Sequence, residues 1–178
     1  MKTFLFLTTC LILVVSASSS SAGVQFGPEG DWNKFSNVAS GDWGIGARLD
    51  AGGDFRFIGS FDYYFVNTDI LGPNNIFTGT PNTNLKFYEI NLNGAYRFPT
   101  EGVQPYLGGG ISISKRTFNN VTLGNFFDDN KTQIGGNVFG GLKLGHEPVQ
   151  PFFEVRGTFY GGNEAFNNRL VLTGGILF

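Results

Sequence analysis

The chain has 178 residues and a formal net charge of −2, and charged residues make up only 15% of it. This length suffices for one domain, and the weak negative charge argues against a nucleic-acid partner. Glycine (27 residues) and phenylalanine (20 residues) are abundant, which favours many short strands over helices.

The first segment, residues 1–22, predicts a secretory signal peptide. Lys2 supplies a positive start, residues 4–15 form an apolar core too short for a good membrane span, and Ser20-Ser21-Ala22 resembles a cleavage site. Cleavage after Ala22 would remove Lys2, the one charged residue of the segment, and change the net charge of −2 to −3. It would also remove Cys10, the one cysteine, so residues 23–178 would have no disulfide and no thiol nucleophile. An uncleaved anchor is the alternative.

The rest of the chain alternates between strand-like segments and turns. Predicted strands lie at residues 23–27, 41–50, 54–66, 85–98, 103–115, 132–145, 149–160 and 168–178. Tight turns at 51–53, 99–102 and 146–148 alternate with longer loops at 28–40, 67–84, 116–131 and 161–167. This rhythm predicts up-and-down antiparallel hairpins, with tight turns at one rim and long loops at the other.

Most predicted strands have an apolar face, and several of them carry charges in mid-strand on the opposite face. Soluble and membrane barrels both show this period of two, so the placement of aromatic residues decides between them. They gather near the tight turns (Phe55, Phe98, Phe152, Phe153, Phe178) and near the long loops (Trp43, Tyr63, Phe65, Tyr88, Phe159). Two such girdles predict a membrane barrel with its apolar face toward lipid, and strands of roughly 9–11 residues suffice to cross.

Several segments resemble the small bacterial outer-membrane β-barrel proteins of the OmpA/OmpX-like superfamily. They are G-I-G-A-R-L-D at 44–50, G-S-F-D-Y-Y-F at 59–65, P-Y-L-G-G-G-I-S at 105–112 and the terminal aromatic residue. The resemblance implies an all-β, eight-stranded antiparallel transmembrane barrel in the bacterial outer membrane. It also implies that the barrel-insertion machinery recognises the last strand. The family's C-terminal signature has apolar residues at alternate positions back from a final aromatic residue. It is matched at Phe178, Ile176, Leu172 and Leu170, and Gly174 departs from it.

The charged faces predict the contents of the barrel lumen. The interior of an eight-stranded barrel is just wide enough to be filled by side chains, and buried charges need partners. The sequence therefore predicts a structural salt-bridge network, with a gated polar conduit (a narrow porin) as the alternative. Its predicted members are Arg48, Arg56, Asp62, Glu89, Arg97, Lys143, Glu154 and Arg156, and Arg169 is a further candidate.

The sequence offers little support for catalysis or for a cofactor. The single histidine, His146, falls in a predicted tight turn away from the long loops, which argues against a rim enzyme that acts on lipid A. No clustered His or Cys residues predict a metal site, and Asp128-Asp129-Asn130 lacks an EF-hand pattern. The glycine run 108–110 is not followed by a helical segment, so no phosphate loop is expected.

The long loops carry the remaining candidates for interaction. Phe77, Phe118, Phe126 and Phe127 are apolar residues at the loop rim, where they could contact a surface ligand or pack together over the barrel. We therefore expect a monomeric, non-catalytic structural or surface-interaction protein. Its expected partners are outer-membrane lipid and lipopolysaccharide, the insertion machinery and a surface ligand. The main rival is a secreted, soluble lipocalin-like barrel that binds an apolar ligand, suggested by Gly41-Asp42-Trp43.

Overall fold

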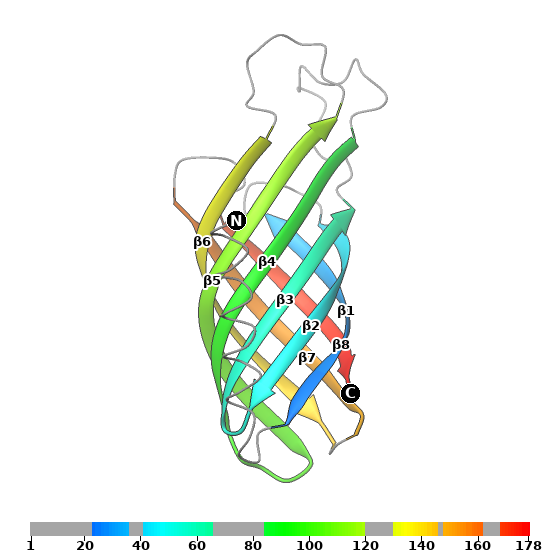
Figure 1. The fold of residues 1–178 in the computed structure, drawn as a ribbon, viewed down its shortest axis with the longest axis vertical. Coiled ribbons are helices and arrows are strands. Elements are labelled where there is room, and N and C mark those ends of the chain that lie inside the picture. The colour runs from blue at the N-terminus through cyan, green and yellow to red at the C-terminus, as the bar shows by residue number, and fades with distance from the viewer. Residues whose placement is uncertain (1–22, 36–40, 66–83, 120–129, 146–147, 162–167) are drawn as a thin grey trace, which may run out of the picture.

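The structure, a computed structural model, shows one closed antiparallel barrel (Figure 1). It describes residues 23–35, 41–65, 84–119, 130–145, 148–161 and 168–178, with the backbone alone at 84–86, 116–119 and 130–131. The predicted fold class is confirmed, and the predicted signal peptide lies outside the described residues. The strands are β1 (Val24–Phe35), β2 (Asp42–Gly52), β3 (Phe55–Phe65), β4 (Asn84–Arg97), β5 (Val103–Asn119), β6 (Asn130–Leu144), β7 (Gln150–Tyr160) and β8 (Asn168–Leu177).

Consecutive strands pair with each other, and the two ends of the barrel differ. Tight connections follow β2, β4 and β6 at one end, which we call the turn rim (Figure 1). Gly52, Gly102 and Gly145 have φ angles of 130°, 79° and 78° at these connections, a backbone region that glycine adopts at little cost. The longer connections begin at the opposite end, the loop rim. No helix among the described residues has the length and apolar character needed to cross a membrane.

The first strand is longer than predicted. Residues 28–35, expected to lie in a loop, continue β1 as far as Phe35. Their lumen positions are polar, as at Glu29 and Asp31, while Pro28 and Gly30 occupy outward positions. Burial in this segment therefore alternates with a period of two, but hydrophobicity does not. Prediction from the sequence relies on alternating hydrophobicity, so it does not detect this part of the strand.

The extended β1 closes the barrel against the last strand. The β1–β8 register runs from Glu29 opposite Gly175 to Phe35 opposite Arg169. Phe178 continues the pairing, because its backbone amide donates to Phe26 O at 2.9 Å and its carbonyl accepts from Phe26 N at 3.2 Å. In the described part of the wall, both terminal strands are therefore paired, and the sheet has no open edge.

The loop predicted at 116–131 is shorter in the structure. β5 reaches Asn119 and β6 begins at Asn130, so only residues 120–129 separate the two strands. Phe118, expected in this loop, belongs to β5 opposite Leu85. Thr117 and Phe118 are good strand formers, but their polar, charged surroundings make the segment resemble a loop.

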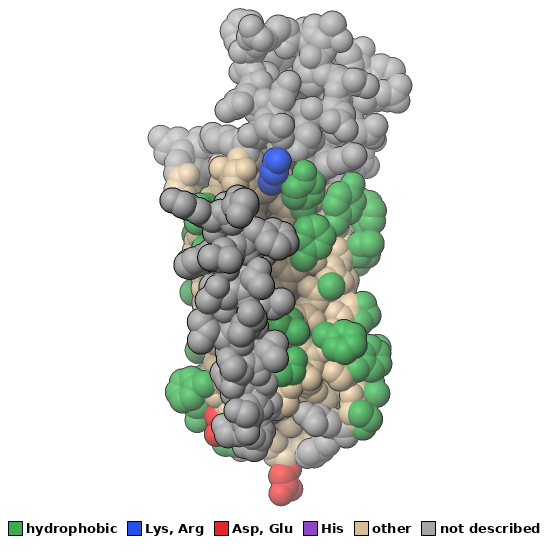
Figure 2. All heavy atoms as spheres, in the orientation of Figure 1, with side chains coloured by type: hydrophobic (Ala, Val, Ile, Leu, Met, Phe, Trp, Pro, Cys, Tyr) green, Lys and Arg blue, Asp and Glu red, His purple; other side chains and the backbone are tan. Residues whose placement is uncertain are grey.

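The wall faces outward with its apolar side and inward with its polar side. Trp43 is 69% exposed near the loop rim and Phe55 is 79% exposed near the turn rim, and Figure 2 shows hydrophobic side chains over the visible wall. This is the reverse of a soluble lipocalin-like barrel. One girdle residue is corrected, since Phe152 is fully buried in the lumen while its neighbour Phe153 faces outward. Adjacent residues of a strand point to opposite faces, so only one of them can join the girdle.

Candidate functional site: the charged lumen

The lumen is closed at the turn rim by a polar cluster around Asp50. Asp50 forms ion pairs with both Arg56 and Lys143. The side-chain carbonyl of Gln25 accepts hydrogen bonds from Arg56 Nη2 at 3.3 Å and Lys143 Nζ at 3.4 Å, and Gln25 Nε2 donates to Gln150 Oε1 at 2.9 Å. Side chains from β1, β2, β3, β6 and β7 therefore meet across this end of the barrel.

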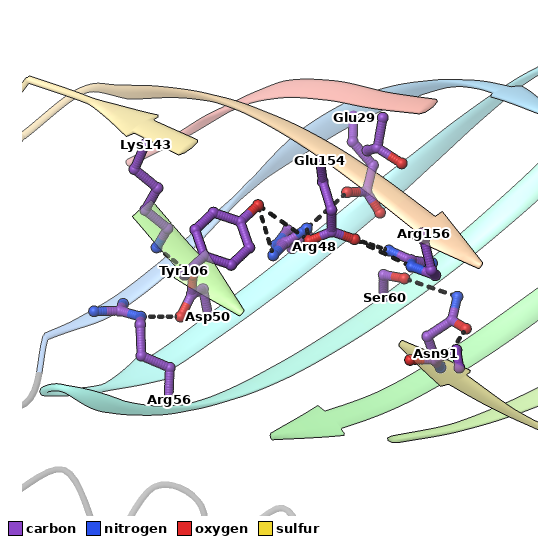
Figure 3. Close-up of polar contacts among 12 residues, drawn as sticks. Glu29, Arg48, Asp50, Arg56, Ser60, Asn91, Tyr106, Lys143, Glu154 and Arg156 are labelled. Atoms are coloured by element: carbon purple, nitrogen blue, oxygen red, sulfur yellow. Dashed lines mark hydrogen bonds and ion pairs between the residues drawn. The ribbon is translucent and has the colours of Figure 1, made fainter. Parts of the chain in front are cut away.

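Glu154 on β7 is the centre of the lumen network (Figure 3). Its Oε2 accepts from Arg48 Nη1 at 2.8 Å and from the Tyr106 hydroxyl at 3.0 Å. Its Oε1 accepts from Arg156 Nη2 at 2.7 Å and Nε at 3.1 Å. Arg48 Nη1 also lies 3.8 Å from Glu29 on β1. The carboxylate is thus held between two buried arginines, which offsets the cost of removing all three charges from water.

Aromatic rings complete the environment of Arg48. Its guanidinium carbon lies 4.5 Å from the ring centroid of Phe152 and 5.6 Å from that of Tyr106. A ring face attracts a cation, and more strongly where water is excluded. The inward position of Phe152 therefore supports the charge network rather than the outer girdle.

A second acidic centre, Glu89, lies nearer the loop rim. Arg156 Nη1 is 3.6 Å from Asp62 and 4.0 Å from Glu89, which links this centre to Glu154. Glu89 forms an ion pair with Arg169 and accepts a hydrogen bond from the Tyr160 hydroxyl. The Arg169 guanidinium also stacks near buried rings, at 5.0 Å from Phe87, 5.3 Å from Tyr64 and 5.8 Å from Tyr160.

Neutral polar side chains extend the network around the wall. Asn91 Nδ2 donates to Asp62 Oδ2 at 3.0 Å and to Ser60 Oγ at 3.2 Å. Asn91 Oδ1 accepts from Ser112 Oγ at 2.5 Å, and Asn137 Nδ2 donates to Ser112 at 2.8 Å. The network thereby passes from β3 across β4 and β5 to β6.

Glycines make room for the large rings of the lumen. In each case the ring lies opposite a glycine on the neighbouring strand, and a Cβ added there would contact it. The pairs are Tyr64 with Gly44, Tyr106 with Gly141, Phe139 with Gly108, Phe152 with Gly175 and Tyr160 with Gly135. The sequence does not predict these pairs. A glycine at a lumen position can be recognised from strand alternation, but the ring that lies opposite it on the next strand cannot.

The structure brings most of the predicted lumen residues together. Those buried in the lumen are Arg48, Arg56, Asp62, Glu89, Lys143, Glu154 and Arg156, and Arg169 joins them. Arg97 is a correction, because its side chain is 24% exposed at the turn rim, where it faces Asp54 at 3.6 Å. It occupies the last position of β4, beyond the enclosed part of the lumen.

Other lumen residues were absent from the predicted network. Glu29 and Asp31 belong to the predicted loop at 28–40, but both are buried in the lumen. The Asp31 carboxylate accepts a hydrogen bond from Thr173 at 2.6 Å. Asp50 and Tyr106 are buried in the lumen as well, and the predicted network does not include them. Asp50 lies two residues after Arg48 on β2, so strand alternation places both residues on the same face. This spacing is the signal that could have added Asp50 to the network.

The remaining candidates lie elsewhere. Leu170, Leu172, Ile176 and Phe178 are exposed on the outer face of the terminal segment. The described residues include no group of His, Cys, Asp or Glu side chains that could hold a metal ion. The candidates Phe77, Phe126, Phe127, His146, Asp128 and Asp129 lie outside the described residues.

Comparison with known proteins supports the fold. No family model and no curated protein matches the chain. Neisserial surface protein A (NspA) has a solved structure that matches with 23% identity and a TM-score of 0.59, over 88% of this chain and 97% of that one. The N-terminal β-barrel domain of Pseudomonas aeruginosa OprF matches with 16% identity and a TM-score of 0.55, over 86% of this chain and 97% of that one. The chain therefore has the fold of the small eight-stranded outer-membrane barrels, as the resemblance implied, and the predicted outer-membrane location agrees with this fold and with the apolar outer wall.

Proposed function

We propose that this chain is an integral outer-membrane barrel protein with a structural and surface-interaction role and without catalysis. One observation carries the proposal: the lumen is filled by buried, mutually paired charges around Glu154, while the outer wall is apolar. Because side chains fill the lumen, we expect the protein to contact other molecules through its rim and its outer wall. The charged interior then serves to hold the barrel in one shape.

Export and insertion follow from the two ends of the chain. The signal peptide at 1–22 directs export, and the mature chain begins at Gly23. The outward residues Leu170, Leu172, Ile176 and Phe178 present the terminal strand to the barrel-insertion machinery. The protein acts as a monomer and contacts outer-membrane lipid and lipopolysaccharide through its apolar wall. Its closed sheet has no free strand edge with which a second copy could pair.

Membrane location is tested by fractionation of cells that express the full chain. We expect the protein in the outer-membrane fraction, with an electrophoretic mobility that changes when the folded barrel is heated. Mass spectrometry of the same band should give a chain that begins at Gly23. A soluble periplasmic or extracellular pool, unchanged by heating, would contradict the proposal.

The surface role is tested by removal of loop segments while the strands stay intact. Residues 66–83 and 120–129 are replaced, separately and together, by short glycine–serine connections that leave β3 to β6 complete. We expect binding of the bacteria to host cells or extracellular matrix to fall while the heat-dependent mobility remains. Unchanged binding after both replacements would refute a surface-interaction role.

A further inference from the structure

The described part of the lumen contains more acidic than basic side chains. Seven Asp and Glu side chains are buried there, against five Arg and Lys side chains. If each group kept the charge it has in water at neutral pH, negative charge would exceed positive charge by two in this interior. An uncompensated buried charge is costly, so this interior needs additional positive charge.

Glu29 on β1 is a buried acid with little compensation. Its side chain is fully buried, and neither of its carboxylate oxygens accepts a hydrogen bond from the described residues. The cation beside it is Arg48, whose Nη1 lies 3.8 Å from Glu29 Oε2 but only 2.8 Å from Glu154 Oε2. Figure 3 shows Glu29 next to this tighter pair. Arg48 therefore leaves both oxygens of Glu29 without a donor.

A second carboxylate faces Glu29 across a glycine. Gly46 on β2 lies opposite Glu29 on β1 and opposite Asp62 on β3. Both acidic side chains lie over Gly46, because a Cβ added there would overlap Asp62 Oδ1 and lie 3.1 Å from Glu29 Cγ. Asp62 Oδ2 accepts hydrogen bonds from Ser60 and Asn91, whereas Oδ1 accepts none from the described residues. The oxygen of Asp62 without a donor is thus the one that lies over Gly46.

The surrounding charged groups do not supply the missing donor. Arg48 and Arg156 both donate to Glu154, and Arg156 Nη1 lies 3.6 Å from Asp62 Oδ2, the oxygen that is already bonded. None of the other described side chains donates to Glu29 or to Asp62 Oδ1. The further titratable or charged groups buried on the strands around this pair are Asp31 on β1, Tyr64 on β3, Glu89 on β4, Tyr106 on β5 and Arg169 on β8.

We propose that Glu29 and Asp62 Oδ1 bind one proton between them at neutral pH. A protonated carboxyl group donates a hydrogen bond, so the proton turns two oxygens without donors into a donor and an acceptor. It also removes one of the two surplus negative charges. Two carboxylates that share a site hold a proton more tightly than an isolated carboxyl group does. A metal ion is a poorer candidate, because the described residues include no group of three side chains able to hold one.

The bound proton is a ligand of the folded barrel. In the unfolded chain both carboxyl groups are exposed to water and ionised above about pH 5, so unfolding releases the proton. Stability contributed by this site is therefore greatest in acid and is lost as the pH rises. This inference concerns the interior of the barrel and does not depend on the surface-interaction role.

The variant Glu29→Gln tests the proton, because glutamine is neutral at every pH and its amide can donate to Asp62 in the proton's place. Unfolding of the barrel from phosphatidylcholine vesicles is measured from about pH 5 to about pH 9. The folding equilibrium constant of the wild type should fall by up to about tenfold per pH unit within this range, because the folded barrel binds one proton more than the unfolded chain. Glu29→Gln should lose this pH dependence and be at least as stable as the wild type at the alkaline end.

The matched control is Asp54→Asn, which also changes a carboxylate into an amide. Asp54 is 55% exposed at the turn rim, in its pair with Arg97. Asp54→Asn should therefore keep the pH dependence of the wild type.

Infrared spectroscopy detects the proton itself through the carbonyl stretch of a protonated carboxyl group. We expect one such group fewer in Glu29→Gln than in the wild type at neutral pH, and an unchanged number in Asp54→Asn. In the wild type the band should disappear over the same pH range in which stability falls. An alkali cation is distinguished by a comparison of sodium chloride with choline chloride at equal ionic strength, in which the bound proton predicts equal stability.

The contrary outcomes are equally distinct. A Glu29→Gln barrel that fails to fold, or that is less stable than the wild type at every pH, would show that Glu29 is held ionised by Arg48. An unchanged pH dependence or an unchanged infrared band in Glu29→Gln would also overturn the inference. Stabilisation by sodium ions without a carboxyl band would place a metal cation, and not a proton, between the two carboxylates.

Discussion

Glu154 shows how single residues hold the interior together. Its two carboxylate oxygens accept hydrogen bonds from Arg48 on β2, Tyr106 on β5 and Arg156 on β7. All of these groups are buried. Loss of the one negative charge would therefore weaken both arginine contacts at once.

We predict that Glu154→Gln lowers the free energy of unfolding by about 3–5 kcal/mol, as expected when one partner of a buried ion pair is removed. The measurement is the denaturant midpoint of the barrel folded in lipid vesicles. Asp54→Asn is the control, because Asp54 is 55% exposed in its pair with Arg97, and an exposed pair contributes less than about 1 kcal/mol. Similar small losses for both variants would contradict a stabilising lumen network.

At the scale of elements, the β1–β8 seam decides whether the barrel closes. The sequence pattern predicts a first strand at residues 23–27, whereas β1 runs from Val24 to Phe35. The missed segment has Pro28 and Gly30 outward and acidic residues inward, so it shows none of the apolar periodicity that marks the other strands. Pairing with β8 supplies the backbone hydrogen bonds that make this segment a strand.

Gly27 offers a direct test of the seam. A Cβ at Gly27 would overlap the backbone carbonyl of Ile176 on β8, whereas at Gly30 on the same strand the nearest atom would be 4.0 Å away. We predict that Gly27→Ala reduces the yield of folded, heat-modifiable barrel and lowers its unfolding midpoint, because backbone atoms of both strands must shift. Gly30→Ala should leave both quantities near the wild-type values. Equal behaviour of the two variants would argue against the close β1–β8 approach.

At the scale of the whole molecule, the filled lumen argues against the narrow-porin alternative. The turn-rim cluster around Asp50 and the network around Glu154 occupy successive levels of the interior, and their charged side chains are buried. An ion that passed through would have to break these pairs.

We therefore predict that the purified barrel gives no stepwise conductance in planar lipid bilayers bathed in concentrated potassium chloride. The double variant Arg48→Ser/Glu154→Ser, which removes a bulky pair from the centre, serves as the comparison and should conduct if it folds. Regular conductance steps from the wild type would show that the lumen opens, and they would support the narrow-porin alternative instead.

The class of the fold, the approximate position of each strand and the outward face can be predicted from the residues alone. This is possible because a strand that separates lipid from a polar lumen must alternate, as in Phe55–Phe65. The partners of the charges, the inward position of Phe152, the rim position of Arg97 and the glycines opposite the rings become visible only in the assembled barrel. These depend on the register between strands distant in sequence, such as Arg48 of β2 and Glu154 of β7, and no periodicity within one strand contains that register.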